Sequence, residues 1–354
     1  MSYERRDEPR GLTQRLDDGP VICAEGFLFE LERRGYLQAG TFVPEVVLEE
    51  GEALAQLHRE LVRAGSDIIE AFTYYAHREK LRVIGKEDLL EPLNRQALQI
   101  AHAVAADAEG ERPLVAGNLA NTNIYVPDDA AATAEVRAMF EEQARWAVEE
   151  DAELLIGETF YHAGEARIAL EVMRETGLPT VVTLALPAQG TLLDDVTAED
   201  ACRELEDAGA TVVGLNCFRG PATTLPVLRR IRAAVDGHVA ALPVPYRTDE
   251  QHPTFFNLPD HRGEELPGGR PFPLALEPLQ CNRFEVAAFA REAYGLGVTY
   301  LGLCCGSAPH FIRSMAEALG RTPPASRYSP DLSRHFAFGD DATVRRPAGL
   351  AERL

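Results

Sequence analysis

The chain has 354 residues, a length that a single α/β barrel reaches without a second domain. Hydrophobic residues make up 45% and charged residues 26% of the composition, and no apolar stretch approaches the roughly 20 residues that span a bilayer. The 35 Lys and Arg against 56 Asp and Glu give a net charge of −21, and a surface this acidic repels nucleic acid and anionic lipid.

The N-terminus, MSYERRDEPRGLTQ, lacks the apolar segment of a signal peptide, so we expect a cytoplasmic protein whose thiols stay reduced. Its cysteines then need a role other than disulfide formation, either burial or metal binding. They are Cys23, Cys202, Cys217, Cys281, Cys304 and Cys305. Their placement relative to the expected strands separates the two roles.

Short runs rich in Val, Ile, Leu and Thr recur after a polar leader, residues 1–20, and longer stretches with helical apolar spacing lie between them. The expected strands cover residues 21–27, 67–75, 114–119, 154–160, 180–186, 211–217, 239–244 and 298–305. Eight such units over about 300 residues favour a closed (β/α)8 TIM barrel of the α/β class. An open, doubly wound sheet is the alternative.

Two segments fall outside this alternation. Residues 247–278 follow the seventh expected strand, are rich in Pro and Gly, and form a loop long enough to act as a lid over the catalytic face. Residues 322–354 are weakly patterned, and we expect a short tail that wraps the barrel or a partner. The barrel itself is expected as a single domain over residues 21–321.

Three cysteines lie where strands of the expected barrel end. Cys217 ends the sixth strand in GLNC, and Cys304 and Cys305 end the eighth in GLCCG. Catalytic groups of such barrels lie at the C-terminal strand ends, so the three thiols converge on one rim. Two neighbouring cysteines reach one ion only where the strand is ending, which Gly306 permits.

Three thiolates with one open coordination position make a catalytic rather than a structural Zn²⁺ site. Soft sulfur donors select zinc over magnesium or calcium, and three anionic ligands make the metal a poor Lewis acid for hydrolysis. A thiol that binds at the open position loses its proton and stays nucleophilic. The expected chemistry is alkylation of a zinc-bound thiolate. Burial as a small apolar side chain is the alternative for each cysteine, and we expect it for the other three.

Polar groups at other strand ends are expected on the same rim. Glu158, in the fourth strand, is placed to hold the ammonium group of an amino-acid substrate. Tyr75 ends the second expected strand, where its phenol either occupies the open metal position before substrate arrives or simply packs. Glu25 and Gly26, after the first strand, offer a charge and backbone N–H groups, and Asn216 offers a side-chain amide.

Motifs spread over residues 21–313 resemble the zinc-dependent homocysteine S-methyltransferase family, and most closely its betaine-using members. The motifs are GFLFELERRGYLQAG, LHRELVRAGSDIIEAFTYYAHREKL, GLNC, LALEP, FAREAYGLGVTYLG and CCGSAPHFIR. The resemblance implies a homocysteine-binding (β/α)8 barrel, zinc held by Cys217, Cys304 and Cys305, homocysteine as methyl acceptor and methionine as product. It also implies that Glu158 holds the amino group of homocysteine and that Tyr75 binds zinc when substrate is absent.

The chain departs from the family pattern at donor and acceptor positions. The tryptophan and tyrosine that pack on the quaternary ammonium of betaine correspond to Phe42 and Thr159, so half of the aromatic cage is missing. Ala24, Glu25 and Gly26 replace the family's Asp-Gly-Gly, and GLCCG replaces GGCCG. The tail is also shorter than in the betaine-using members, where it helps to assemble a tetramer. An assembly of identical chains therefore stays open.

We therefore expect a zinc-dependent methyltransferase that moves a methyl group from a betaine-like ammonium or sulfonium donor to homocysteine. The first alternative keeps this chemistry but uses another small thiol or selenol. The second is a zinc- or thiol-binding sensor without catalysis, which Ala24 in place of the family's aspartate favours. Small molecules, and neither nucleic acid nor membrane, are the expected partners.

Overall fold

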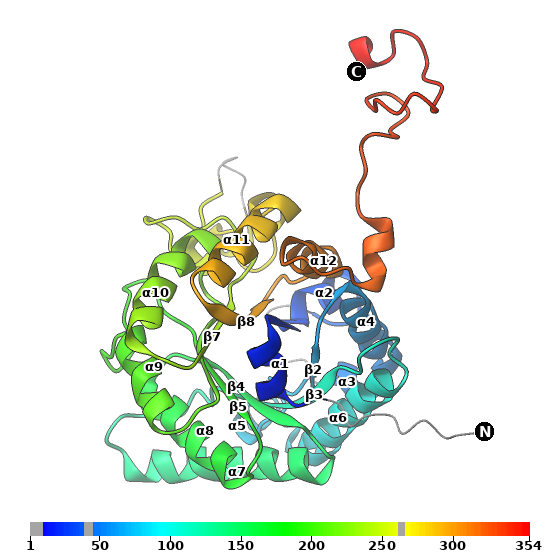
Figure 1. Cartoon of the computed structure of the whole chain (residues 1–354). Helices are drawn as coiled ribbons and strands as arrows, with labels where there is room; N and C mark the ends of the chain where they lie inside the picture. The colour runs from blue at the N-terminus through cyan, green and yellow to red at the C-terminus, as the bar shows by residue number, and fades with distance from the viewer. Residues whose placement is uncertain (1–9, 39–44, 261–265) are drawn as a thin grey trace, which may run out of the picture.

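The computed structural model describes residues 10–38, 45–260 and 266–354. Within these ranges parallel strands close into one barrel, in which each strand pairs with the next and β8 pairs with β1 (Figure 1). The strands are β1 (Val21–Ala24), β2 (Ile68–Glu70), β3 (Leu114–Ala120), β4 (Leu154–Phe160), β5 (Thr180–Leu184), β6 (Val212–Asn216), β7 (His238–Leu242) and β8 (Val298–Leu303). The expected (β/α)8 TIM barrel is confirmed.

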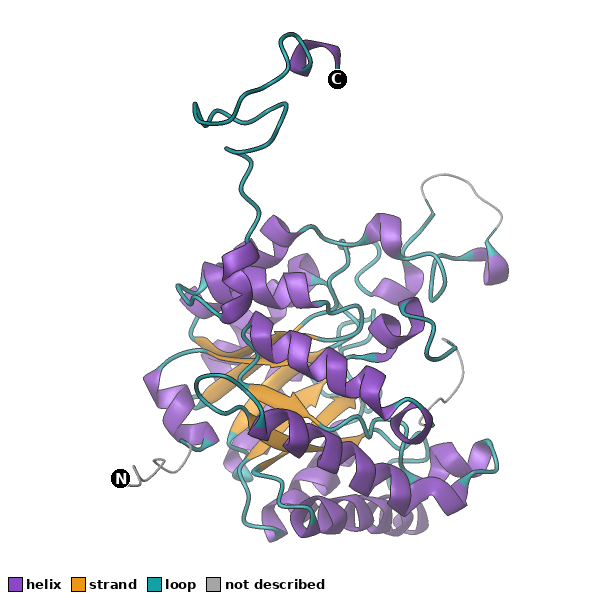
Figure 2. Cartoon of the chain, turned by 90° about the vertical axis from the view of Figure 1, so that its right-hand side faces the viewer, coloured by secondary structure: helices purple, strands orange, loops and turns teal. Residues whose placement is uncertain are grey.

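Helices surround the barrel, as Figures 1 and 2 show. The α-helices are α1 (Leu12–Asp18), α2 (Leu28–Arg33), α3 (Val46–Glu49), α4 (Gly51–Ala64), α5 (Arg78–Val83), α6 (Leu90–Ala106), α7 (Ala130–Glu149), α8 (Ala163–Glu175), α9 (Ala198–Asp207), α10 (Pro221–Ala234), α11 (Arg283–Gly295) and α12 (Pro309–Ala318). The 3-10 helices are η1 (Glu87–Leu89), η2 (Phe255–Asn257), η3 (Pro267–Gly269), η4 (Glu277–Leu279), η5 (Pro324–Tyr328) and η6 (Ala351–Arg353). Among the described residues, no helix has the length and apolar character needed to cross a membrane.

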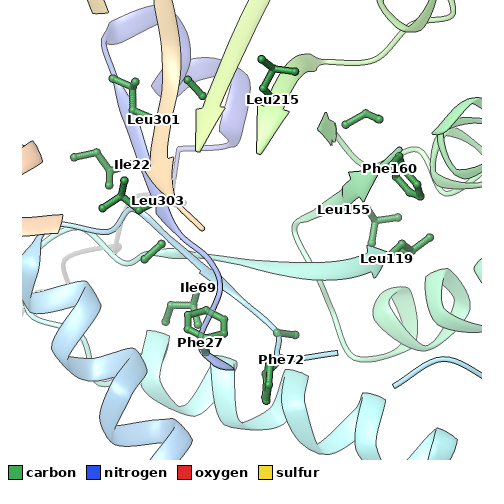
Figure 3. Packing of buried hydrophobic residues seen from close by; sticks show 14 of the residues in the cluster. Ile22, Phe27, Ile69, Phe72, Leu119, Leu155, Phe160, Leu215, Leu301 and Leu303 are labelled. Carbon is green, nitrogen blue, oxygen red and sulfur yellow. The ribbon is translucent and has the colours of Figure 1, made fainter. Parts of the chain in front are cut away.

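Side chains along each strand alternate between two apolar clusters. Val21 and Cys23 of β1 pack with Tyr300 of β8 in the barrel interior. Ile22 and Ala24 belong instead to the outer cluster between strands and helices, part of which Figure 3 shows. Because parallel strands are covered on both faces, their sequences read as continuous apolar runs. The prediction that Cys23 is a packed core residue is confirmed.

Helix α1 closes the N-terminal end of the barrel, across whose opening it lies in Figure 1. Leu12 and Leu16 are buried and pack with the inward-pointing strand residues. The buried Arg15 donates to the backbone carbonyls of Asp67, at 3.2 Å, and Arg112, at 2.7 Å. The leader assigned to residues 1–20 therefore contains part of the core.

Several strands end earlier than their apolar runs predict. β1 ends at Ala24 rather than at residue 27, β2 at Glu70 rather than at residue 75, and β8 at Leu303 rather than at residue 305. The backbone turns just beyond β1 and β8, as the positive φ of Gly26 (72°) and Gly306 (93°) shows. Apolar residues past the strand ends pack in the rim loops, so hydrophobicity alone placed these boundaries wrongly.

The tail begins against the barrel and then leaves it. At η5, the Nη1 atom of Arg313 donates to the carbonyls of Ala325, at 3.4 Å, and Tyr328, at 3.1 Å. Beyond η5 the chain runs away from the barrel in both Figure 1 and Figure 2. The expectation that the tail wraps the barrel is therefore wrong. The alternative, that the tail wraps a partner, stays a prediction.

Candidate metal and substrate site

Three thiols meet at the C-terminal rim of the barrel. Cys217 directly follows β6, and Cys304 and Cys305 follow β8. The Sγ atom of Cys305 lies 3.7 Å from that of Cys217 and 4.0 Å from that of Cys304, and all three Sγ atoms lie within 4.8 Å of one another. Tetrahedral zinc with Zn–S bonds of about 2.3 Å spaces its sulfurs about 3.8 Å apart. The three donors therefore fit one such ion with a position left for a fourth ligand.

Unusual backbone angles bring these thiols together. Cys217 and the following Phe218 have φ of 53° and 47°, in the left-handed region that side chains rarely adopt. Gly26 has φ of 72°, and a Cβ atom there would lie 2.3 Å from the backbone nitrogen of Cys305 and 2.4 Å from the carbonyl carbon of Cys304. Only glycine fits this position. The left-handed backbone at Cys217 and the close approach at Gly26 together place the three thiols on the same part of the rim.

Contact among the thiols changes their acidity. Hydrogen bonds from Cys217 and Cys304 lower the pKa of Cys305 to about 5. The contacts with Cys217 and Cys305 raise the pKa of Cys304 well above its ordinary value. One thiolate thus forms readily at neutral pH, and the thiolate is the form that binds soft metal ions.

Three buried glutamates lie beside the thiols, and two amides connect them. Asn118 of β3 donates from Nδ2 to Glu70 Oε1, at 2.6 Å, and to Glu158 Oε1, at 2.7 Å. Asn216 of β6 donates from Nδ2 to Glu158 Oε2, at 2.8 Å, and to Glu25 Oε2, at 3.4 Å. Burial raises the pKa of Glu158 to about 7, and burial together with the charge of Glu158 raises the pKa of Glu25 and of Glu70 well above 4.5.

Thr159 holds one of these carboxylates in place. Its φ is 61°, its side chain is buried, and its Oγ1 atom donates to Glu158 Oε2 at 3.1 Å. Its backbone N–H donates to Asn216 Oδ1 at 3.0 Å. The threonine thus supports the glutamate beside it. Phe42, the other residue expected at the donor cage, lies outside the described residues.

A cavity opens beside the thiols and carboxylates, and many of its walls are aromatic. Phe218 follows Cys217, Phe255 and Phe256 come from η2, and Phe272 comes from the same long loop after β7. The ring centroid of Phe256 lies 4.9 Å from that of Phe218, 4.4 Å from that of Phe255 and 4.6 Å from that of Phe272. We call these four residues the phenylalanine cluster. Among the described residues, no Lys, Arg or His lines the cavity.

The structure brings most of the predicted site residues to this cavity. Those that line it are Gly26, Tyr75, Glu158, Thr159, Cys217, Cys304 and Cys305. Glu25 and Asn216 lie behind the wall, in contact with each other and, through Asn216, with Glu158. They contact the buried glutamates from behind and do not face the cavity.

Sequence reasoning missed Glu70 and the phenylalanine cluster. Glu70 did carry a signal, because it is a charged residue within the apolar run IIEAF, and a buried charge in a strand needs a partner. The phenylalanines carried little signal. Three of them lie in a loop rich in Pro and Gly, whose path over the rim no periodicity describes.

Residues 22–319 match the family model described as homocysteine S-methyltransferase. The chain is 36% identical over 341 residues to betaine–homocysteine S-methyltransferase 1 of Xenopus tropicalis, a match that covers 93% of this chain and 80% of that protein. The chain belongs to the homocysteine S-methyltransferase family. It is therefore a methyltransferase, and the reaction of the family is methyl transfer to homocysteine, which gives methionine.

Other family members differ in their methyl donor. The S-methylmethionine–homocysteine S-methyltransferase of Pongo abelii is 36% identical over 330 residues, which cover 90% of this chain and 84% of that protein. Among solved structures, the metallated form of the homocysteine methyltransferase MmuM from Escherichia coli has a TM-score of 0.66 at 16% identity and covers 84% of this chain and 96% of its own. That likeness supports the barrel fold.

Proposed function

We propose that this family member is a zinc-dependent homocysteine S-methyltransferase in which Cys217, Cys304 and Cys305 hold Zn²⁺. The observation that carries the proposal is the spacing of the thiols, 3.7 and 4.0 Å for the two pairs that include Cys305, which suits tetrahedral zinc. Bound there, zinc would supply an open position at which the homocysteine thiol loses its proton yet stays nucleophilic. The need for reduced thiols supports a cytoplasmic location.

Glu158 is proposed to hold the ammonium group of homocysteine. Its Oε2 atom accepts hydrogen bonds from Asn216, at 2.8 Å, and Thr159, at 3.1 Å, so the carboxylate cannot turn freely. A fixed carboxylate that lines the cavity sets where the acceptor's sulfur lies relative to the cysteines. Tyr75 lines the same cavity and is proposed to occupy the open metal position before the acceptor binds.

The phenylalanine cluster is proposed to hold the methyl donor. Aromatic ring faces attract the positive charge of an ammonium or sulfonium group, and these rings lie in the same apolar cluster as the cysteines. In the transfer, a bond forms from the acceptor sulfur to the methyl carbon and the bond from that carbon to the donor's nitrogen or sulfur breaks. A thiolate and an onium cation become two neutral groups, so an apolar cavity that excludes water favours the reaction.

Replacement of Cys217 by alanine tests the metal proposal. We expect the purified variant to lose most of its zinc and all measurable methyl transfer, because two cysteines do not make a catalytic zinc site. Zinc is measured by elemental analysis and methyl transfer by the methionine formed from homocysteine with betaine or S-methylmethionine. Cys202→Ala, at a cysteine buried in α9, is the matched control and should keep both. Unchanged zinc content and turnover in Cys217→Ala would refute the mechanism.

A further inference from the structure

Glu70 and Glu158 form a pair of carboxylates in the wall of the cavity. Glu70 is 2% exposed and Glu158 is 4% exposed, and both line the cavity. One amide nitrogen, Asn118 Nδ2, donates to an oxygen of each, at 2.6 and 2.7 Å. None of the ion pairs found among the described residues includes either carboxylate. Two carboxylates held this close in a buried site repel each other unless a cation or a proton lies between them.

The amide that bridges this pair has a buried polar atom without a partner among the described residues. The Oδ1 atom of Asn118 is buried and accepts no hydrogen bond from the described residues, although Asn118 itself lines the cavity. An orphaned buried acceptor is costly, so native structures rarely leave one unless a ligand completes it. The nearest lysine does not fill the need, because Lys80 donates from Nζ to the carbonyl of Tyr74 at 2.9 Å and lies 3.9 Å from the centroid of that tyrosine's ring.

We propose that Glu70 is a second anchor for the ammonium group of the acceptor, which bridges Glu70 and Glu158. The proposal rests on the proposed function and deepens it. A primary ammonium has three N–H donors, and the wall offers two carboxylates and the free Oδ1 of Asn118 to receive them. Glu25 is not a third anchor, because it does not line the cavity.

The pair of carboxylates favours acceptors that carry an ammonium group. A thiol with a nearby primary ammonium gains two charge-assisted hydrogen bonds, whereas a thiol without the ammonium leaves the two wall carboxylates without a cation between them. The acceptor is therefore an amino thiol such as homocysteine. Thiols that keep the chain and the carboxylate but lack the amino group are rejected.

The test compares two thiols that differ only in the ammonium group. Homocysteine and 4-mercaptobutanoate are titrated calorimetrically into the zinc-loaded wild-type protein and into Glu70→Gln. The glutamine still accepts from Asn118 but carries no charge. Loss of a charged hydrogen bond weakens binding roughly 10- to 100-fold, so Kd for homocysteine should rise by that factor while Kd for 4-mercaptobutanoate stays the same or falls. Glu70→Met, of similar size, is the second variant if the first does not fold.

Glu165→Gln is the matched control. Glu165 is also a buried carboxylate, but it accepts hydrogen bonds from the backbone and hydroxyl of Thr122 and does not line the cavity. Its replacement should leave the ratio of the two Kd values unchanged. If Glu70→Gln weakens both thiols equally, or leaves the ratio at its wild-type value, Glu70 does not bind the ammonium. If the zinc-loaded wild-type protein binds neither thiol, the proposed function itself fails.

Discussion

Thr159 differs from the residue found at its position in the betaine-using members of the family. Its position corresponds to a tyrosine of the betaine-using members, and the resemblance placed it at the donor cage. In the structure Thr159 lines the cavity, and its hydroxyl donates to Glu158 Oε2 at 3.1 Å. The aromatic contacts proposed for a cationic donor come from another part of the chain, the phenylalanine cluster, in which Phe256 contacts three other rings.

Replacement of Phe256 by leucine tests this shift. Leucine keeps the apolar wall but removes the ring face, whose attraction for a desolvated cation is worth roughly 0.5–2 kcal/mol. We expect KM for the onium donor to rise about 2- to 30-fold, while Kd for homocysteine, measured calorimetrically, stays unchanged. Phe284→Leu, at an exposed ring on α11, is the control. Equal KM values for the donor in Phe256→Leu and the wild type would place the donor elsewhere.

At the residue scale, the sequence predicted what a local pattern records. The thiols could be found because two short motifs end two strands, and barrel geometry brings strand ends together. The link between Glu70 and Glu158 could not be found in this way. It runs through Asn118, which lies 48 residues from one glutamate and 40 from the other, and only the register of β2, β3 and β4 makes the three neighbours.

At the scale of the element, α1 shows why a polar leader can be part of the core. Only Leu12, Arg15 and Leu16 of this helix are buried, so it has too few apolar residues to stand out from its charged surroundings. The helix stabilises the fold because it lies across the N-terminal end of the barrel and covers the inward-pointing strand residues there. Strand and helix alternation alone does not predict such a closure.

Replacement of Leu16 by alanine measures that closure. Leu16 is 3% exposed and packs against the inward-pointing strand residues. A buried Leu→Ala change costs about 2–5 kcal/mol, and we expect a loss of that size in the free energy of unfolding by denaturant, with zinc content unchanged. Leu332→Ala, at an exposed leucine of the tail, should cost less than about 0.5 kcal/mol. A Leu16→Ala variant as stable as the wild type would show that α1 does not seal the barrel.

The order of the elements was predictable, and their ends were not. Apolar runs identified every strand of the barrel because parallel strands are buried on both faces. The same property blurs the boundaries, since Phe27 and Phe72 are apolar residues that pack beyond the ends of β1 and β2. A strand ends where the backbone turns, as it does at Gly26. The sequence does not show why a glycine is needed there, because the reason is the close approach of the backbone that follows β8.

At the scale of the whole molecule, a buried histidine makes the free energy of unfolding depend on pH more than any single exposed acidic residue does. The net charge of −21 is spread over exposed side chains, many of them in ion pairs worth little individually. His58 of α4 is different. It is 2% exposed, its ring meets that of Phe27 edge-on at 5.0 Å, and its Nε2 atom has no hydrogen-bond partner among the described residues.

Burial lowers the pKa of His58 from 6.5 to about 3, so the folded protein keeps this ring neutral where the unfolded chain protonates it. Between these two values the unfolded state binds more protons at this residue, and the contribution of His58 to the stability of the fold therefore falls as pH falls through 6.5. At pH 5 this single group lowers the free energy of unfolding by about 2 kcal/mol relative to pH 8. The loss grows until the pH reaches about 3.

Denaturant unfolding of the wild type and His58→Gln between pH 8 and pH 5 tests this dependence. Glutamine does not titrate, so the variant should be less stable than the wild type at pH 8, where it lacks the packed ring, and should lose about 2 kcal/mol less on going to pH 5. The constant difference between the two proteins from pH 7.5 to pH 8.5 serves as the internal control. Parallel curves down to pH 5 would mean that His58 is protonated in the folded protein.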